Sequence, residues 1–162
     1  MWRVQKNRLP IKIELDNKGI DLNSVLCPVC NDKIESINHA LVACKSAASL
    51  WEKVRLWWGL DNLPIASYSD LALCSSPHIR DNSGAQIWQA VIWVTTYYIW
   101  KNRNALDFGN NASSIPCLFS DIQSKSYEWI NCRGRNIELE WLTWITNPKS
   151  CSFNLKSKDG IG

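Results

Sequence analysis

The feature that most constrains this chain is the stretch CPVCNDKIESINHALVAC, which sets one of only two histidines among three cysteines. Its first two cysteines form a Cys-x2-Cys pair, which brings two sulfurs to one side of a tight turn. The histidine and the third cysteine both lie in NHALVAC, a segment the length of one helical turn and its end. Three thiolates and one imidazole suit tetrahedral Zn²⁺ and leave no open position for water, so we expect a structural zinc site. The predicted ligands are Cys27, Cys30, His39 and Cys44.

The alternative is coincidence, because the chain holds seven cysteines and a lone histidine is more often an ordinary polar residue than a ligand. Both features fall within eighteen residues, at spacings that metal sites use, which favours the metal site. Glu35 could orient the knuckle through a hydrogen bond, as carboxylates near metal ligands do. An exposed first-turn glutamate is an equally open alternative for Glu35.

The remaining cysteines have no close partner in the sequence and lie on or near apolar helix faces. We therefore expect buried small hydrophobic side chains at Cys74, Cys117, Cys132 and Cys151. His78, in SSPHIR, is expected to be a loop residue.

The length of 162 residues suits one domain with enough apolar side chains for a core, so disulfides are not needed for folding. The opening MWRVQKNRLP has no apolar run, so no signal peptide is expected. The longest apolar-rich stretch, Ile87 to Trp100, falls short of the roughly 20 residues that span a bilayer. We expect an intracellular protein, nuclear or cytoplasmic, with reduced thiols and no membrane contact.

Apolar side chains recur at helical spacing along most of the chain, which predicts a mainly α fold: a small zinc knuckle followed by a compact helical bundle. The only hairpin turn is expected around Pro28 and Val29, and Ser67 with Asp70 has the spacing of a capping box. The predicted helices are Lys12–Lys18 ended by Gly19, Ala47–Trp58 ended by Gly59, Gly84–Leu106, Ser113 or Ser114 to Gly134, and a short one with Trp141 and Trp144 ended by Pro148. We divide the chain into a knuckle region with flanking helices (1–60), a helical region packed on it (61–147) and a polar tail (148–162).

The excess of positive charge lies in the first sixty residues, which hold nine Lys or Arg against six Asp or Glu, whereas the rest holds nine of each. This asymmetry permits contact with a polyanion without demanding it. The candidate nucleic-acid contacts are Arg3, Lys6, Arg8 and Lys12, with Lys33, Lys45, Lys53 and Arg55 beyond the first cysteine pair. A solvated helix surface is an equally good interpretation of any single one of them.

Several runs (CPVC, ESINH, ACKSA and LWEKV followed by WW) resemble the zinc-binding domain downstream of the polymerase in plant non-LTR (LINE-type) retrotransposon reverse transcriptases. The lead-in WRVQKNRLPIK and the later IWKNRNALDF and EWLTWITNP are similar to segments of the same plant proteins. The resemblance covers most of the chain and is sharpest over residues 2–58. It implies the four ligands named above and an aromatic residue at Trp51. Ile11 stands where the family commonly has Thr, so a helix N-cap hydroxyl is missing there.

The resemblance implies a zinc-binding module that contacts RNA or DNA. Because the chain starts at a methionine just ahead of the knuckle, we expect a C-terminal remnant of a longer element protein. It has no adjacent Asp-Asp for a polymerase metal pair, so we expect no enzyme activity and no small-molecule substrate. Any RNA-directed DNA polymerase label would be inherited from the parent.

The alternative function is a zinc-stabilised structural or protein-interaction domain whose core contains the ten tryptophans. Exposure of tryptophans beside the basic residues would favour nucleic-acid binding, because indole rings stack on bases. Burial of all of them would favour the alternative. The residues that test this are Trp57, Trp58, Trp88 and Trp100.

Overall fold

The computed structural model describes residues 9–60, 65–73, 82–133 and 139–151. Its elements are helices, and within these residues the only β pairing is an isolated antiparallel bridge between Leu26 and Ile34. The elements are α2 (Lys12–Asp16), the single π-turn η1 (His39–Ala43), α3 (Lys45–Trp57), α4 (Tyr68–Leu73), α5 (Asn82–Asp107), α6 (Ile115–Arg133), α7 (Trp141–Thr146) and the 3-10 turn η2 (Pro148–Ser150). The predicted mainly α fold, a knuckle followed by a helical bundle, is confirmed.

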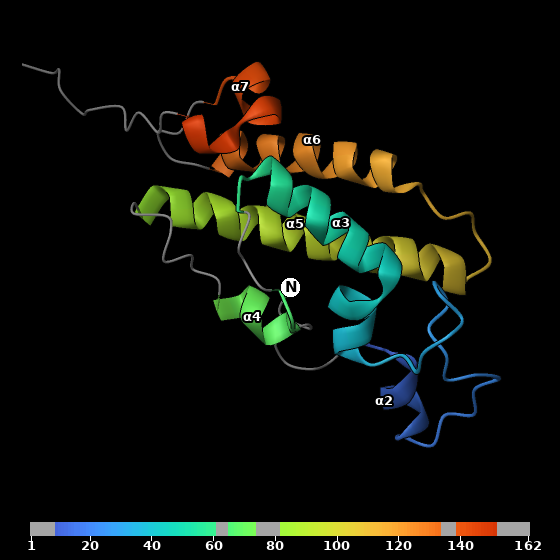
Figure 1. The fold of residues 1–162 in the computed structure, drawn as a ribbon. Helices are drawn as coiled ribbons and strands as arrows, with labels where there is room; N and C mark the ends of the chain where they lie inside the picture. Colours follow the sequence, from blue (N-terminus) through green and yellow to red (C-terminus); the bar gives the residue numbers. More distant parts are fainter. Residues whose placement is uncertain (1–8, 61–64, 74–81, 134–138, 152–162) are drawn as a thin grey trace, which may run out of the picture.

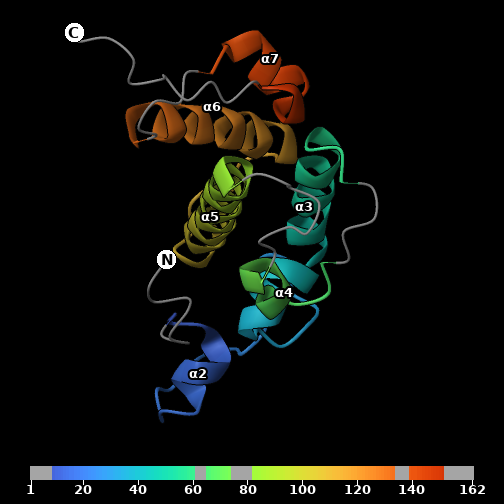
Figure 2. The ribbon, with the colours of Figure 1, turned by 90° about the vertical axis from the view of Figure 1, so that its left-hand side faces the viewer.

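Helix α5 is the centre of the arrangement. It packs along α6 and against η1, while α3 packs on α6 and η1, and α7 packs on the outer side of α6. Figure 1 shows α3 crossing in front of α5, and Figure 2 shows α6 and α3 on adjacent sides of it. The turn η1, which carries the predicted ligand His39, therefore packs on α5, a helix that starts at Asn82, well beyond the last predicted ligand, Cys44.

Helix ends follow the signals in the sequence. Gly59 ends α3 with φ of +64°, a conformation that glycine adopts without steric cost, and its N–H donates to the Leu56 carbonyl. The Leu60 N–H reaches back to the Arg55 carbonyl at 3.0 Å, which completes a Schellman motif. The first helix ends at Asp16, earlier than the predicted Lys18, and Gly19 closes the following turn with φ of +76° and an N–H that donates to the Asp16 carbonyl at 2.8 Å.

The capping box before α4 is present. The Ser67 N–H donates to Asp70 Oδ2 at 2.7 Å, and the Asp70 N–H donates to Ser67 Oγ at 3.2 Å. Two otherwise unpaired backbone donors are thus satisfied by the reciprocal pattern that the spacing predicted.

Four tryptophans tie α3, α5 and α7 together. The ring centroids of Trp57 and Trp144 lie 5.0 Å apart and those of Trp58 and Trp88 lie 5.1 Å apart. The Trp57 indole N–H donates to the Trp144 carbonyl, and the Trp144 indole N–H donates to the Gln123 carbonyl on α6. The short helix α7 is therefore held by edge-to-face ring contacts and by hydrogen bonds to α3 and α6.

The prediction of buried cysteines is wrong at Cys117 and Cys132, which are both exposed. The buried face of α6 contains Leu118, Ile122 and Ile130. At about 100° of rotation per residue, Cys117 and Cys132 point away from that face. Cys151 is buried as predicted. Cys74 and His78 lie outside the described residues.

The start of the predicted polar tail is packed. Pro148 and Cys151 are buried, and Lys149 Nζ donates to the Gly59 carbonyl at 2.6 Å. Residues 152–162 lie outside the described ranges. None of the described helices combines the length and the apolar character that crossing a membrane requires.

Replacement of Trp144 by Ala is expected to lower the free energy of unfolding by about 3–5 kcal/mol, because a fully buried indole leaves a cavity. Leu142→Ala on the same helix, at a side chain that is 64% exposed, is the matched control and should stay within about 0.5 kcal/mol of the parent. Urea unfolding followed by circular dichroism measures both. Equal losses in the two variants would contradict the docking of α7.

Candidate metal centre

The first ligand pair lies in a tight antiparallel loop. The Leu26–Ile34 bridge closes this loop, and the Cys27 N–H donates to the Lys33 carbonyl at 2.8 Å. The chain turns at residues 28–30, where the sequence predicted it, and Asn31 continues the loop with φ of +52°. Asn tolerates this left-handed conformation better than most residues. The loop brings both sulfurs to one side.

The second ligand pair is set by η1. The Cys44 N–H donates to the His39 carbonyl at 2.8 Å, an i→i+5 bond that defines a π turn. Such a turn brings residues five apart to the same side of the chain, which an α-turn would not do. Ser36 Oγ accepts the His39 N–H at 3.1 Å and so fixes where the turn begins. Cys44 is also the N-cap residue of α3, so the site lies at the start of that helix.

The structure brings all four predicted ligands together. One donor atom from each of Cys27, Cys30, His39 and Cys44 can be chosen so that all lie within 4.8 Å of one another. Cys30 Sγ and His39 Nε2 are 3.3 Å apart. Tetrahedral zinc with bonds of about 2.0–2.3 Å requires donor atoms roughly 3.3–3.8 Å apart, so this cluster fits the ion with small adjustments.

The three thiols of this cluster differ in pKa, and so in how readily each becomes a thiolate. Burial raises the pKa of Cys27 to about 12, and burial likewise raises the pKa of Cys44. At Cys30, burial acts in the same direction, but backbone N–H groups of Asp32 and Lys33 and the His39 side chain outweigh it and lower the pKa to about 6. Three thiolates at this separation need a cation to offset their charge, so metal binding must displace protons from the buried pair.

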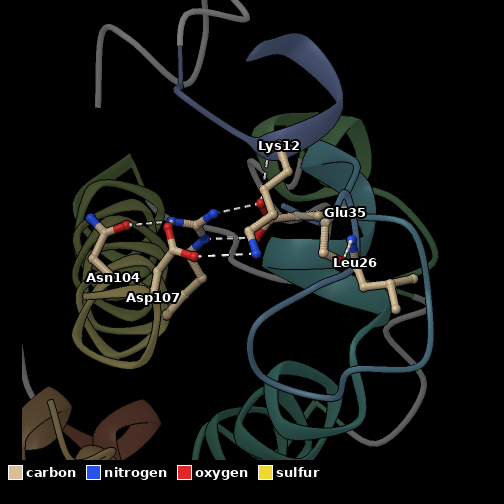
Figure 3. Close-up of polar contacts among 7 residues, drawn as sticks. Lys12, Leu26, Glu35, Asn104 and Asp107 are labelled. Carbon is tan, nitrogen blue, oxygen red and sulfur yellow. Dashed lines mark hydrogen bonds and ion pairs between the residues drawn. The ribbon is translucent and has the colours of Figure 1, made fainter. Parts of the chain in front are cut away.

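Glu35, between the two ligand pairs, is completely buried, which excludes the alternative of an exposed glutamate. Its carboxylate makes no hydrogen bond to His39. It accepts from the Lys12 backbone N–H at 2.9 Å and forms a two-pronged ion pair with Arg103 on α5, with both N–O distances 2.6 Å (Figure 3). Arg103 is not among the residues that the sequence pattern singled out. Its spacing from Ile99 and Thr96, at i+4 and i+7 on one buried helix face, was the available signal.

The structure distributes the candidate nucleic-acid contacts unevenly. Lys12 Nζ lies 3.3 Å from Asp107, and Arg55 donates to Glu52 and to the Leu60 carbonyl, so these cations have protein partners. Lys53 Nζ lies 6.0 Å from the Phe119 ring. The candidates Arg3, Lys6 and Arg8 lie outside the described residues.

Two of the candidate cations flank the metal centre. Lys33 and Lys45 are exposed and line an open pocket of about 540 Å³ together with Cys30, His39 and Asp32. The metal centre is therefore open to solvent where these two lysines lie, although the Cys27 and Cys44 side chains are themselves buried.

The tryptophans named as a test are mostly internal. Trp58 and Trp88 are buried, whereas Trp57 and Trp100 are half-buried. The Arg103 guanidinium lies 5.0 Å from the Trp100 ring, so that ring already has a cationic partner. None of the four is fully exposed for stacking on a base.

The set of three cysteines and one histidine, ahead of a helical bundle, indicates a zinc-binding domain. Residues 1–51 match the protein family described as zinc-binding in reverse transcriptase. The match covers all four clustered residues and about a third of the chain. No curated protein and no solved structure gives a significant match to the chain.

Cys30→Ser, or treatment with a strong chelator, is expected to unfold at least residues 1–60, because the binding energy of structural zinc, about 10–16 kcal/mol in small domains, is folding energy. Cys132→Ser replaces an exposed cysteine that is not in the cluster and is the matched control. Thermal melts by circular dichroism, with and without chelator, provide the comparison. A melt of the parent protein that ignores the chelator would count against a structural metal.

Proposed function

We propose that this chain is a zinc-binding module that contacts RNA or DNA and that descends from the C-terminal region of a plant non-LTR (LINE-type) retrotransposon reverse transcriptase. The observation that carries the proposal is the convergence of two ligand pairs from different local structures on one point. The family match over residues 1–51 supports the reverse transcriptase origin, and the later plant-like motifs support the finer assignment.

The donor chemistry favours Zn²⁺. Thiolates and imidazole together select zinc over the oxygen-binding cations Mg²⁺ and Ca²⁺. Four protein donors complete a tetrahedron, so no position is left at which water or substrate could be activated. We propose a structural ion and a binding role without catalysis. Free thiols require a reducing compartment, which supports a nuclear or cytoplasmic location.

The metal face is the best candidate for the nucleic-acid contact. Lys33 and Lys45 are exposed beside the pocket that opens onto Cys30 and His39. Lysine ammonium groups bind phosphate as point charges, so this contact would position a strand without reading its sequence. Asp32 on the same rim reduces the local charge, which predicts modest affinity.

The alternative, a structural or protein-interaction domain, is supported by the tryptophans. Trp58, Trp88 and Trp144 are buried, and the Trp58 ring contacts the other two, so these three have a role in the core that needs no ligand. An absence of nucleic-acid binding at low salt would favour this alternative.

Metal content is the direct test of the cluster. We expect one zinc ion per chain by native mass spectrometry of protein purified without added metal, and about 0.1 or fewer after Cys30→Ser if ligand loss weakens affinity by several orders of magnitude. A parent protein that carries no metal and takes up none from added Zn²⁺ would overturn the zinc assignment.

Salt dependence tests the nucleic-acid contact. Binding of a single-stranded RNA should weaken with added salt, and Lys33→Gln/Lys45→Gln should reduce the slope of log K against log salt by about 1.4, at about 0.7 per phosphate contact. Lys101→Gln/Lys125→Gln removes the same charge from exposed positions on α5 and α6 and should leave the slope unchanged. Filter binding at several salt concentrations gives the slopes, and equal slopes in both double variants would refute the metal face as the contact.

A further inference from the structure

The segment between the two ligand pairs is fixed at Glu35. Its N–H donates to the Val25 carbonyl at 2.9 Å, just before the first cysteine pair, and its carbonyl accepts the Ile13 N–H at 3.4 Å. Its neighbour Ser36 accepts the His39 N–H and the Ala40 N–H, and these bonds begin the turn that carries His39. Glu35 itself bonds to Val25, just before the first cysteine pair, and its neighbour Ser36 bonds to His39 of the second pair. Glu35 therefore lies where the positions of both ligand pairs are set.

The Glu35 carboxylate is in turn held by α5. Arg103 Nε and Nη2 donate to its two oxygens, while Arg103 Nη1 donates to Asn104 Oδ1 at 3.0 Å and to Asp107 Oδ2 at 2.9 Å. Lys12 Nζ pairs with Asp107, so two cations and two carboxylates form one group with no net charge (Figure 3). Both carboxylate oxygens of Glu35 therefore accept hydrogen bonds, which fix the orientation of the side chain.

Helices α5 and α6 also lie directly against the segment that carries the ligands. A narrow crevice behind the cluster is lined on one side by Val29, Ala40 and Cys44. Its other side is formed by Ile99 and Asn102 of α5 and by Leu118 of α6. The family match ends at residue 51, so these contacts come from a part of the chain that it does not include.

We propose that Arg103, acting through Glu35, is a positioning residue of the metal centre, and that the metal-binding unit extends from the knuckle through α5. This inference rests on the proposed zinc binding. A pair that only stabilised the fold would alter the unfolding free energy and leave the ligand geometry of the folded protein unchanged. A positioning pair alters the metal affinity and the coordination geometry of protein that is folded.

The test uses the full chain with Glu35→Gln/Arg103→Met, which removes both charges together and leaves no unpaired buried ion. Co²⁺ serves as a spectroscopic probe, because its absorption bands report tetrahedral thiolate coordination, and competition with a chelator gives the Zn²⁺ affinity. The matched control is Lys125→Met/Glu128→Gln, which removes an exposed ion pair on α6. Circular dichroism at saturating metal establishes that each protein is folded.

We expect the Zn²⁺ affinity of the Glu35/Arg103 double variant to fall 10- to 100-fold, with altered Co²⁺ bands, and that of the control to stay within twofold. A folded double variant with parental affinity and parental bands would overturn the positioning role. If the double variant does not fold, Asp107→Asn decides, since it removes one partner of Arg103 and keeps the Glu35 pair: a loss of about threefold or more supports the inference and an unchanged affinity overturns it. Failure of the parent chain to bind either metal would instead overturn the proposed zinc function.

Discussion

The convergence of three sulfurs and one imidazole is the constraint on which the first third of this protein depends. The loop that carries the first cysteine pair is closed by a single β-bridge, and the second pair is joined by a single π turn. Neither element is stable in isolation, because one bridge and one turn do not offset the conformational entropy of ordering the chain. Burial also raises the pKa of Cys27 and Cys44, so both thiols resist ionisation unless a cation lies beside them. One divalent cation resolves both problems.

Metal alone would leave the knuckle unattached to the rest of the molecule. The contacts that attach it include the Glu35–Arg103 and Lys12–Asp107 pairs and the packing of η1 against α3 and α5. A buried ion pair adds little net stability compared with apolar residues of the same size, but it is strongly directional, and loss of one partner costs about 3–5 kcal/mol. The role proposed for the Glu35–Arg103 pair is therefore to orient the knuckle on α5. Leu41 and Trp51 supply the apolar contribution, and the Trp51 indole N–H donates to the Leu41 carbonyl at 2.8 Å.

Local signals predicted most of the fold, because helices are specified by short-range spacing and by capping residues. Gly59 and the capping box of Ser67 and Asp70 act within four residues of their partners, and they are where the sequence places them. The close approach of the four ligands likewise follows from two short spacings. What short-range patterns could not reveal is which charges meet at long range. Glu35 and Arg103 are 68 residues apart, and no local rule pairs them.

The same limit explains why the list of candidate cations changed once the fold was known. In the sequence, Lys12 and Lys33 look equivalent, since both are basic residues near the cysteine cluster. In the fold, Lys12 lies against Asp107 with its side chain 17% exposed, whereas Lys33 lines the open side of the metal centre. A carboxylate beside a cation cancels most of the attraction of that cation for phosphate, whereas an exposed cation without such a neighbour keeps it. The availability of a charge is thus a property of the tertiary structure, which is why Lys33 and Lys45, exposed beside the metal centre, are the described candidates proposed to contact phosphate.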